Sequence, residues 1–358
     1  MIPIIDPVDV QLLKSELNEK TFLRSTNRGN NEIYVVNNEN APNVLREIGR
    51  LREVSFRAVG GGSGKECDLD HFDLDDKACF QLVVWNPEAD EIIGGYRFTR
   101  WSMASFHENG QPYVNTEHLF DFSQKFLDEY FPYCIEMARA FVQPKYQSAQ
   151  MGRKALFALD NLWDGLGALT VLYPEIKYFF GKVTMYPSYS QCCRNMILYF
   201  LHKHFPAKEG LLEPINPVEL GINEESMERL FCGDDYAEDH KILTRELKER
   251  GEFIPPMINS YMNVSPSMMV FDTVINPDFG GVEETGILIT IADLYPHKLE
   301  RHTRGLKRLR RLRKLFDHTM IALDKVVTGK AASTVKVALR RRHTERTRRV
   351  ARDEKNKE

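Results

Sequence analysis

The sequence lacks a long hydrophobic run and a secretory leader. No stretch of its 358 residues approaches the ~18 uninterrupted apolar residues that cross a bilayer. The N-terminus, MIPIIDPVDVQLLKSELNEK, has no basic segment followed by an apolar one, which is the pattern of a signal peptide. We therefore expect a cytoplasmic protein.

The sequence also lacks cysteine pairs. Its six cysteines form no Cys-x-x-Cys pair and show no Cys/His spacing typical of zinc sites. Cys192 and Cys193 are adjacent and are not expected to pair with each other. We expect free thiols in a reducing compartment, no metal site and no permanently bound cofactor.

The chain has little net charge, but its positive and negative residues are unevenly distributed along the sequence. In all, 48 Lys and Arg oppose 51 Asp and Glu, for a net charge of −3. Residues 297–358 contain 21 of these cations and 7 of the anions, or +14, which leaves −17 for residues 1–296. An acidic body carries a strongly basic C-terminal segment.

Hydrophobic periodicity predicts one mixed α/β domain over residues 1–296. Strands are expected at 33–37, 79–86, 91–101, 134–142, 177–186, 268–275 and 285–294, and helices at 43–59, 153–172, 190–205, 224–231 and 236–250. The last two helices fall in an acidic segment, 207–251, which we interpret as a helical insertion. Because strands and helices do not alternate strictly, a doubly wound fold is not expected.

The C-terminal segment, residues 297–358, has a different pattern. Apolar residues recur every three or four positions: Leu306, Leu309, Leu312, Phe316, Met320, Leu323 and Val327. Arg and Lys fill the first half of the opposite face, so residues 298–327 are predicted to form a basic amphipathic helix. The nearly all-polar segment from Arg340 onward is predicted to be disordered.

Two motifs in the first third of the chain suggest ligands but fit them poorly. The glycine-rich loop 60–66 (GGGSGKE) has Val59 and Glu66 where a phosphate loop needs Gly and Ser or Thr, so a flexible loop is favoured. An acidic cluster follows, but without the spacing of a calcium loop, so a solvated loop is favoured there. The cluster consists of Asp68, Asp70, Asp73, Asp75 and Asp76.

Glu136 and Arg139 are charged residues inside an otherwise apolar strand, 134–142. Charged groups in a central strand are costly unless paired, so one interpretation is a structural ion pair. In a regular strand, however, the two side chains would point to opposite faces, and they can converge only across a β-bulge. The small Ala138 and Ala140 would leave room for a ligand beside Glu136.

Residues 146–155 (YQSAQMGRKA) join this strand to the long helix. The free amides of a first helical turn form a natural anion site, and Gly152 permits close backbone approach. An ordinary strand-to-helix turn explains the same residues, so both interpretations stay open.

Taken together, these pieces form an ordered series. It consists of Arg52-x-x-x-Phe56, Asp70-x-x-Asp73, GGYR ending in Arg97, and Glu136-x-x-Arg139-x-Phe141-Val142. The series resembles the GNAT-like N-acyltransferases that use acyl carrier protein, both the haemolysin-like ornithine- and glycine-lipid enzymes and the acyl-homoserine-lactone synthases. The resemblance runs from about residue 30 to 295. The segments 162–166, 179–190, 253–263 and 276–281 are more similar to the lipid enzymes.

The resemblance implies a GNAT-like fold and an acyl transfer. A long-chain fatty acyl thioester, with or without a 3-hydroxyl, on the phosphopantetheine arm of acyl carrier protein would meet the amine of an amino acid such as glycine or ornithine. Glu136 would be the general base, with Asp73 as second candidate. Backbone N–H groups near Phe141 and Val142 would hold the oxyanion.

The resemblance also implies binding residues. Arg97 and Arg139 would bind the amino acid carboxylate or orient the acidic groups, while Arg52, Phe56 and Asp70 would shape the amine side. The turn containing Gln147, Gly152 and Arg153 would receive the pantetheine phosphate. Gln150 replaces the first glycine of the usual phosphate motif, which favours carrier protein over free acyl-CoA.

The basic C-terminal segment lies outside the resemblance and has three interpretations. It can dock on an anionic membrane through 298–327, giving a peripheral location on the inner face, or attract acidic acyl carrier protein. It can also pack on the acidic body. The alternative function is a nucleic-acid-binding protein with a degenerate body, but the Arg-rich residues 338–352 contain no aromatic residue for base stacking, so nucleic acid is not the expected partner.

Overall fold

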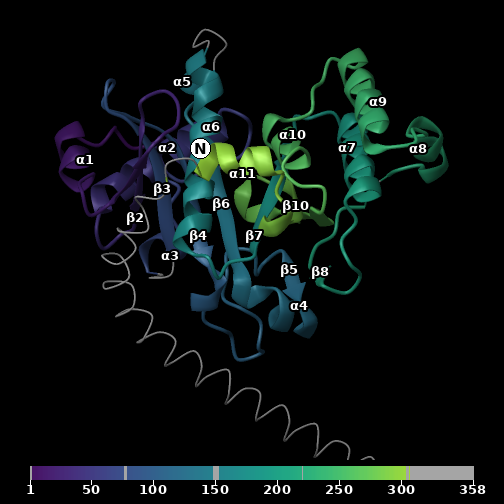
Figure 1. The fold of residues 1–358 in the computed structure, drawn as a ribbon, viewed down its shortest axis with the longest axis horizontal. Helices are drawn as coiled ribbons and strands as arrows, with labels where there is room; N and C mark the ends of the chain where they lie inside the picture. Colours follow the sequence, from purple (N-terminus) through teal and green to yellow (C-terminus); the bar gives the residue numbers. More distant parts are fainter. Residues whose placement is uncertain (1, 76–78, 148–152, 220, 304–305, 307–358) are drawn as a thin grey trace, which may run out of the picture.

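The computed structural model describes residues 2–75, 79–147, 153–219, 221–303 and 306, and in it a twisted mixed sheet runs through the centre of the protein (Figure 1). Its strands are β1 (Phe22–Ser25), β2 (Glu32–Val36), β3 (Cys79–Asn86), β4 (Glu91–Arg100), β6 (Cys134–Val142), β7 (Tyr178–Met185), β9 (Met269–Asn276) and β10 (Val282–Thr290). Their order is β1-β2-β3-β4-β6-β7-β10-β9, and only β6 and β7 are parallel among these described strands. A short second sheet pairs β5 (Phe120–Phe122) with β8 (Leu212–Pro214).

Helices cover both faces of the sheet (Figure 1). They are α1 (Val10–Glu16), α2 (Pro42–Arg57), α3 (His71–Leu74), α4 (Gln124–Glu129), α5 (Pro144–Gln147), α6 (Arg153–Leu172), α7 (Gln191–His204), α8 (Glu224–Leu230), α9 (Tyr236–Glu249), α10 (Pro256–Met262) and α11 (Pro296–Thr303). The strands and helices predicted from periodicity are confirmed within a few residues at each end. The elements that were not predicted are short or irregular, such as α1, β1, α3 and α10.

Alternation along the strands separates the core into two faces. Leu82 and Val84 pack with α6 and α7, whereas their neighbour Val83 packs with α1 and α2. A further cluster of aromatic residues around Trp101 lies on the same sheet face as α2, because Phe180 belongs to it while Phe179 faces α6 and α7. The α2 face therefore carries two apolar clusters, and the candidate site lies between them.

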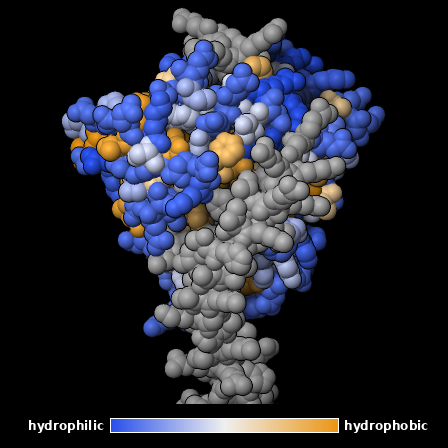
Figure 2. All heavy atoms as spheres, turned by 60° about the vertical axis from the view of Figure 1, so that its left-hand side comes forward, coloured by the Kyte–Doolittle hydropathy of each residue, from blue (hydrophilic) through white to orange (hydrophobic). Residues whose placement is uncertain are grey.

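The surface on the α1 side is mostly hydrophilic. Over the described residues of this face, hydrophobic side chains form several small areas separated by hydrophilic ones (Figure 2). No helix within the described ranges is both long and apolar enough to span a bilayer.

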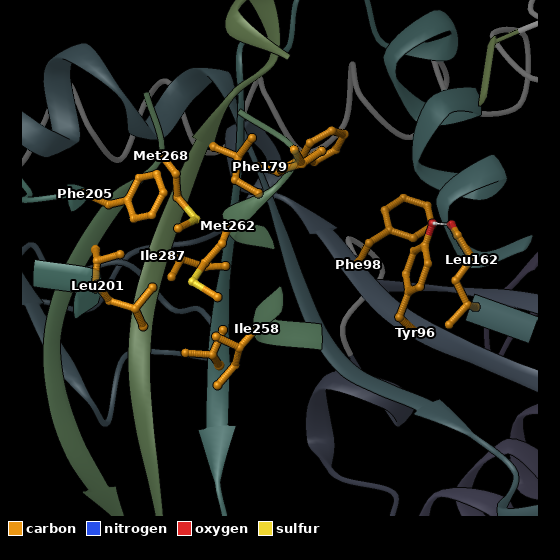
Figure 3. Close-up of a cluster of buried hydrophobic side chains, with 14 of the residues drawn as sticks. Tyr96, Phe98, Leu162, Phe179, Leu201, Phe205, Ile258, Met262, Met268 and Ile287 are labelled. Carbon is orange, nitrogen blue, oxygen red and sulfur yellow. Dashed lines mark hydrogen bonds between the residues drawn. The ribbon is translucent and has the colours of Figure 1, made fainter. Parts of the chain in front are cut away.

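The segment after α7 joins the main core. Figure 3 shows Leu201 and Phe205 packed with Ile258 and Met262 of α10 around Ile287 of β10. The predicted insertion, 207–251, also contributes to this cluster through Phe231, Leu243 and Leu247. Most of its acidic residues are exposed on the outer side of its helices, whereas Asp239 is buried and binds Lys203 and His204.

The body of the protein extends past residue 296, where the sequence suggested a boundary. Helix α11 packs against α6, and the His302 Nδ1 atom lies 2.8 Å from Oδ1 of the buried Asp164. Arg24 donates to the His302 carbonyl at 2.8 Å, and a Cβ on Gly167 would lie 2.7 Å from that oxygen. Leu306 is buried as well. The rest of the predicted amphipathic helix and polar tail, 307–358, lies outside the described residues.

We predict that Gly94→Ala lowers the free energy of unfolding by about 2 kcal/mol, because a Cβ there would lie 2.4 Å from the Phe141 carbonyl oxygen of the neighbouring strand. Backbone atoms of a paired strand cannot move away as a flexible side chain can. Urea unfolding measures the change. Gly221→Ala is the control, since a Cβ at that position would meet no other atom within 4 Å; equal stability of both variants would contradict the prediction.

Candidate active site

Strand β6 contains the bulge that the charged pair predicted. Gly95 pairs with Phe141 and Arg97 pairs with Ala138, so β6 holds one more residue than β4 between these pairs. Arg139, at the bulge, has a φ of +52°, which is uncommon for a residue other than glycine. The bulge is confirmed, but Glu136 and Arg139 are not partners of each other. Arg139 turns toward the acidic loop, while Glu136 points to the Trp101 cluster.

The two parallel strands at the centre of the sheet pair over a short distance. β6 has nine residues and β7 has eight, yet the pairing covers only Cys134–Glu136 against Tyr178–Phe180. Since alternate backbone N–H groups of a strand point to each side, β6 beyond Glu136 presents amides that β7 does not use. The bulge therefore lies where the sheet opens.

Glu136 is buried at this point and only half satisfied. Its Oε2 atom accepts from the Trp101 indole at 3.0 Å and from the Asn115 backbone N–H at 3.2 Å. Its Oε1 atom accepts no hydrogen bond of normal geometry from the described residues. Burial raises the pKa of Glu136, and the hydrogen bond from Trp101, the charge of Lys182 and a contact with Thr116 offset this only in part.

Asp73 lies in the same region with very different neighbours. Both of its carboxylate oxygens accept from Nη1 of Arg52 at 3.1 Å, and Oδ1 also accepts from the Gln81 amide at 2.8 Å. Arg97 adds an ion pair at 3.1 Å. Burial alone would raise the pKa of Asp73, but Arg52 and Arg97 hold it well below its usual range.

Arg97 connects this group to Glu136. One nitrogen, Nη1, donates to Oδ1 of Asp70 at 2.6 Å, and the other, Nη2, donates to the side-chain oxygen of Asn115. The backbone N–H of Asn115 in turn donates to Glu136. Asp70 and Asp73 also form a capping box that starts α3, which fixes the acidic loop relative to the arginines.

Arg139 is the most accessible of Arg52, Arg97 and Arg139, the arginines expected on the acceptor side. Its side chain is 16% exposed, compared with 0% for Arg52 and 1% for Arg97. It forms ion pairs with Asp68 at 3.1 Å and Asp70 at 3.7 Å, and its guanidinium lies 4.6 Å from the centre of the Phe279 ring. Phe279 also contacts the buried Phe56 edge to face.

The residues expected on the donor side are placed only in part. Phe141 and Val142 follow the bulge at the end of β6, opposite Gly95 and Gly94. Gln147, at the end of α5, donates from its amide to the Val142 carbonyl at 2.6 Å. Gly152 and the Arg153 side chain lie outside what the structure describes.

The glycine-rich loop 60–66 is occupied by one of the protein's own carboxylates. Glu53 accepts from the backbone N–H groups of Ser63 at 3.1 Å and Gly64 at 2.8 Å, and from the Ser63 hydroxyl at 2.9 Å. Arg57 binds the same carboxylate at 2.6 Å. The amides that would bind a phosphate are used internally, which agrees with the expectation against a nucleotide site.

The acidic loop is not a solvated cluster, contrary to the favoured interpretation. Asp68 and Asp73 are buried and, with Asp70, bind arginine side chains, because a carboxylate inside the protein needs a cation or hydrogen-bond donors. Within the described ranges, no group of three or more Asp, Glu, His or Cys residues is arranged to hold a metal ion. All six cysteines are free thiols.

The sequence of this chain is similar to those of known proteins over most of its length. The sequence model of the family described as "Acetyltransferase (GNAT) domain" matches residues 51–156. A glycine N(alpha)-acyltransferase of Phocaeicola vulgatus is 53% identical over 302 residues, covering 84% of this chain and 93% of the relative. One of Bacteroides thetaiotaomicron, with the same name, is 54% identical over 302 residues, covering 84% and 90%. The chain belongs to this family of GNAT-type amino acid N-acyltransferases.

Two solved acyltransferases overlap weakly with this family member. A CoA-dependent acyl-homoserine lactone synthase with SAM and isopentyl-CoA is 13% identical and covers 51% of this chain and 79% of its own, with a TM-score of 0.27. A cAMP-binding acyltransferase from Mycobacterium smegmatis is 15% identical, covers 66% and 59%, and has a TM-score of 0.24. The mixed sheet and the GNAT match, rather than these overlaps, establish the fold of the acyltransferase.

Several residues in and around the candidate site were not singled out from the sequence. They are Gln81, Trp101, Asn115, Lys182 and Glu284. Gln81, Lys182 and Glu284 are polar residues inside apolar strand patterns, the same signal that drew attention to Glu136. Trp101 ends the strand predicted at 91–101 but lies just past β4 in the structure, and Asn115 comes from the irregular segment before β5, where no periodicity marks it.

We predict that Asp73→Asn destabilises the acyltransferase by about 3 kcal/mol at pH 7, because the buried Arg52 and Arg97 lose their carboxylate. Since the folded-state pKa of Asp73 is lowered, its ionisation stabilises the fold above the ordinary aspartate value of 3.8 and this contribution is lost as the pH falls further. The stability difference between wild type and variant should therefore narrow below about pH 4.

Urea unfolding at several pH values measures this difference. Asp121→Asn serves as the matched control, because Asp121 lies exposed on β5. A difference between wild type and Asp73→Asn that stays constant with pH would show that the charge of Asp73 does not stabilise the fold.

Proposed function

We propose that this acyltransferase moves a long-chain fatty acyl group from the phosphopantetheine arm of acyl carrier protein to the amine of glycine, in aminolipid biosynthesis. The names of the two relatives favour glycine over ornithine as the acceptor. The observation that carries the proposal is the buried Glu136 with its raised pKa, whose Oε1 atom has no hydrogen bond of normal geometry among the described residues and lies where β6 and β7 stop pairing. A buried acceptor without a partner is costly unless a ligand completes it.

The reaction needs a base, and Glu136 fits that role. The acceptor's ammonium would lose a proton to Oε1, and the free amine would attack the thioester carbonyl. The C–N bond forms, the C–S bond then breaks, and the phosphopantetheine sulfur leaves and takes up a proton. Because its pKa is raised, Glu136 is a better proton acceptor than Asp73, which two arginines keep ionised.

The bulge supports stabilisation of the developing negative charge. Backbone N–H groups around Phe141 and Val142 follow the point where β7 leaves β6, and N–H groups aimed at an oxyanion are an effective source of rate enhancement. We propose that the thioester carbonyl lies against this part of β6. The turn after it, with Gln147, Gly152 and Arg153, would receive the pantetheine phosphate.

Arg52, Arg97 and Arg139 would have different roles. Arg52 and Arg97 are fully buried and already bind Asp70, Asp73, Gln81 and Asn115, so we propose that they act by holding the acidic loop and Asn115 in place. Arg139, partly exposed over Phe279, would line the acceptor side together with Phe56. This assigns Arg52 and Arg97 a positioning role instead of direct contact with the carboxylate.

We predict that Glu136→Gln lowers acyl transfer at least about 100-fold, since the amide cannot accept the proton. It still accepts the Trp101 and Asn115 hydrogen bonds, so the melting temperature should change little. Mass spectrometry of lipids from cells that express each protein checks the reaction: wild type should produce N-acylglycine, and the variant should not.

The pH profile separates a general base from a structural residue. The wild-type rate should fall as the pH decreases through the raised pKa of Glu136, above the ordinary glutamate value of 4.5, and the variant should lack this limb. N-acylornithine in place of N-acylglycine would correct the acceptor. Retained turnover with a large loss of stability would show that Glu136 is structural, and no new N-acyl amino acid would reject the function.

We further propose that the basic C-terminal segment docks the enzyme at an anionic membrane surface, where a long-chain product would partition. Each Lys or Arg near such a surface contributes roughly 1 kcal/mol. The same charge can attract acyl carrier protein, which is acidic. The alternative function, nucleic-acid binding with a degenerate body, gains no support from relatives that are acyltransferases along 84% of the chain.

We predict that a tail variant of the full chain, with six cations replaced by Gln, binds anionic vesicles at least tenfold more weakly. The replaced residues are Lys307, Arg308, Arg310, Arg311, Arg313 and Lys314. Co-sedimentation with vesicles measures binding. A control variant replaces six exposed cations of the body, Lys20, Arg28, Lys125, Arg229, Lys241 and Arg245, and should bind as wild type does. Unchanged vesicle binding with a lower melting temperature would show that the segment packs on the body instead.

A further inference from the structure

A second pair of charges lies across the opening from the bulge. The Nζ atom of Lys182 on β7 lies 2.9 Å from Oε2 of Glu284 on β10, and the two side chains are only 7% and 5% exposed. Ionised groups this deeply buried are costly, and apolar residues would serve stability as well. Their position beside the site therefore calls for a reason.

The two members of this pair are not equally satisfied. Glu284 accepts from the Asn276 amide at 2.7 Å and from the Thr184 hydroxyl at 3.3 Å, in addition to its contact with Lys182. An ammonium group has three donors. Among the described residues, Glu284 is the one partner of the Lys182 ammonium. Glu284 is thus fixed by several hydrogen bonds, whereas the Lys182 ammonium has N–H donors available to bind a ligand.

The sheet places Lys182 on the same face as Glu136. Glu136 pairs with Phe180, and Lys182 lies two residues further along β7, in the stretch that no longer pairs with β6. The charges are close enough to act on one another: Lys182 favours the ionised form of Glu136, and Arg139 favours that of Glu284. An α-amino acid, with an ammonium beside a carboxylate, complements this alternation of charge.

We propose that Lys182 binds the carboxylate of the acceptor amino acid and thereby holds its amine toward Oε1 of Glu136. This rests on the proposed function. The other cations are less suited: both terminal nitrogens of Arg97 already bind Asp70, Asp73 and Asn115, and Arg139 pairs with two aspartates and lies over the Phe279 ring. Glu284 orients Lys182, and Asn276 fixes Glu284 while it also caps the turn at Pro277–Phe279.

The test compares glycine with glycinamide, which keeps the amine but lacks the carboxylate. With purified full-length enzyme and an acyl-carrier-protein thioester, Lys182→Met should raise the KM for glycine at least tenfold and change kcat less. Its kinetics with glycinamide should stay near those of wild type, so the preference for glycine falls by the same factor. Lys182→Arg should keep the preference, because a guanidinium also binds a carboxylate.

The matched control is Lys177→Met, an exposed lysine that precedes β7 and lies over the Tyr133 ring. Since Lys182→Met leaves Glu284 buried without its cation, the double variant Lys182→Met with Glu284→Gln gives the same readout without that charge. An unchanged glycine preference in the folded single or double variant would overturn the proposal. So would loss of the preference in Arg139→Met with its retention in Lys182→Met.

These outcomes are distinct from failure of the proposed function. If wild type acylates no amino acid, the function itself is wrong, and the comparison of glycine with glycinamide then rejects both proposals together. If wild type acylates both amines equally, amino acid acylation stands and Lys182 is not the carboxylate site.

Discussion

The buried contact of Asp73 with Arg52 and Arg97 is the constraint on which the rest of the site depends. These groups lie on one face of the sheet, between the apolar cluster under α2 and the aromatic cluster around Trp101. A charge in that place is tolerated only when its partners are held in position. The contact therefore fixes α2, the acidic loop, β3 and β4 to one another, and Asn115 extends it to Glu136.

The same strip of sheet shows how two carboxylates of similar chemistry acquire different properties. Asp73 and Glu136 are both buried, and burial by itself raises the pKa of each. Two guanidinium groups reverse the effect at Asp73, whereas at Glu136 the neutral donors and the more distant charge of Lys182 offset it only in part. One carboxylate is kept as a fixed charge, and the other remains able to exchange a proton.

The strands and helices, which have a regular hydrophobic pattern, could be predicted from the sequence. The irregular segments, which have no such pattern, could not. Periodicity located β3, β4, β6, α2 and α6, and two charges inside an apolar strand pointed to the bulge. Gln81, Lys182 and Glu284 are also polar residues in apolar strands, so the same pattern could have identified them as candidate site residues. Trp101 and Asn115 carry no such signal, because an irregular segment places them by tertiary contacts. We predicted a boundary at 296 because the charge of the sequence changes there. His302 nevertheless packs against the body, because it contacts the buried Asp164, and the charge pattern carries no sign of this contact.

Two of the buried polar atoms that lack a hydrogen bond of normal geometry lie at the candidate site. Oε1 of Glu136 and the Asn115 amide nitrogen both lack a hydrogen bond of normal geometry within the described residues, and both lie beside the opening between β6 and β7. Each such atom costs about 1–3 kcal/mol when nothing replaces water. Other such atoms lie away from the opening, on Asp160 and Asn161, so the position of these two carries the argument and not their number. An amino acid bound between Glu136 and Lys182, as proposed, would bring a donor to Oε1 of Glu136 and an acceptor to the Asn115 amide.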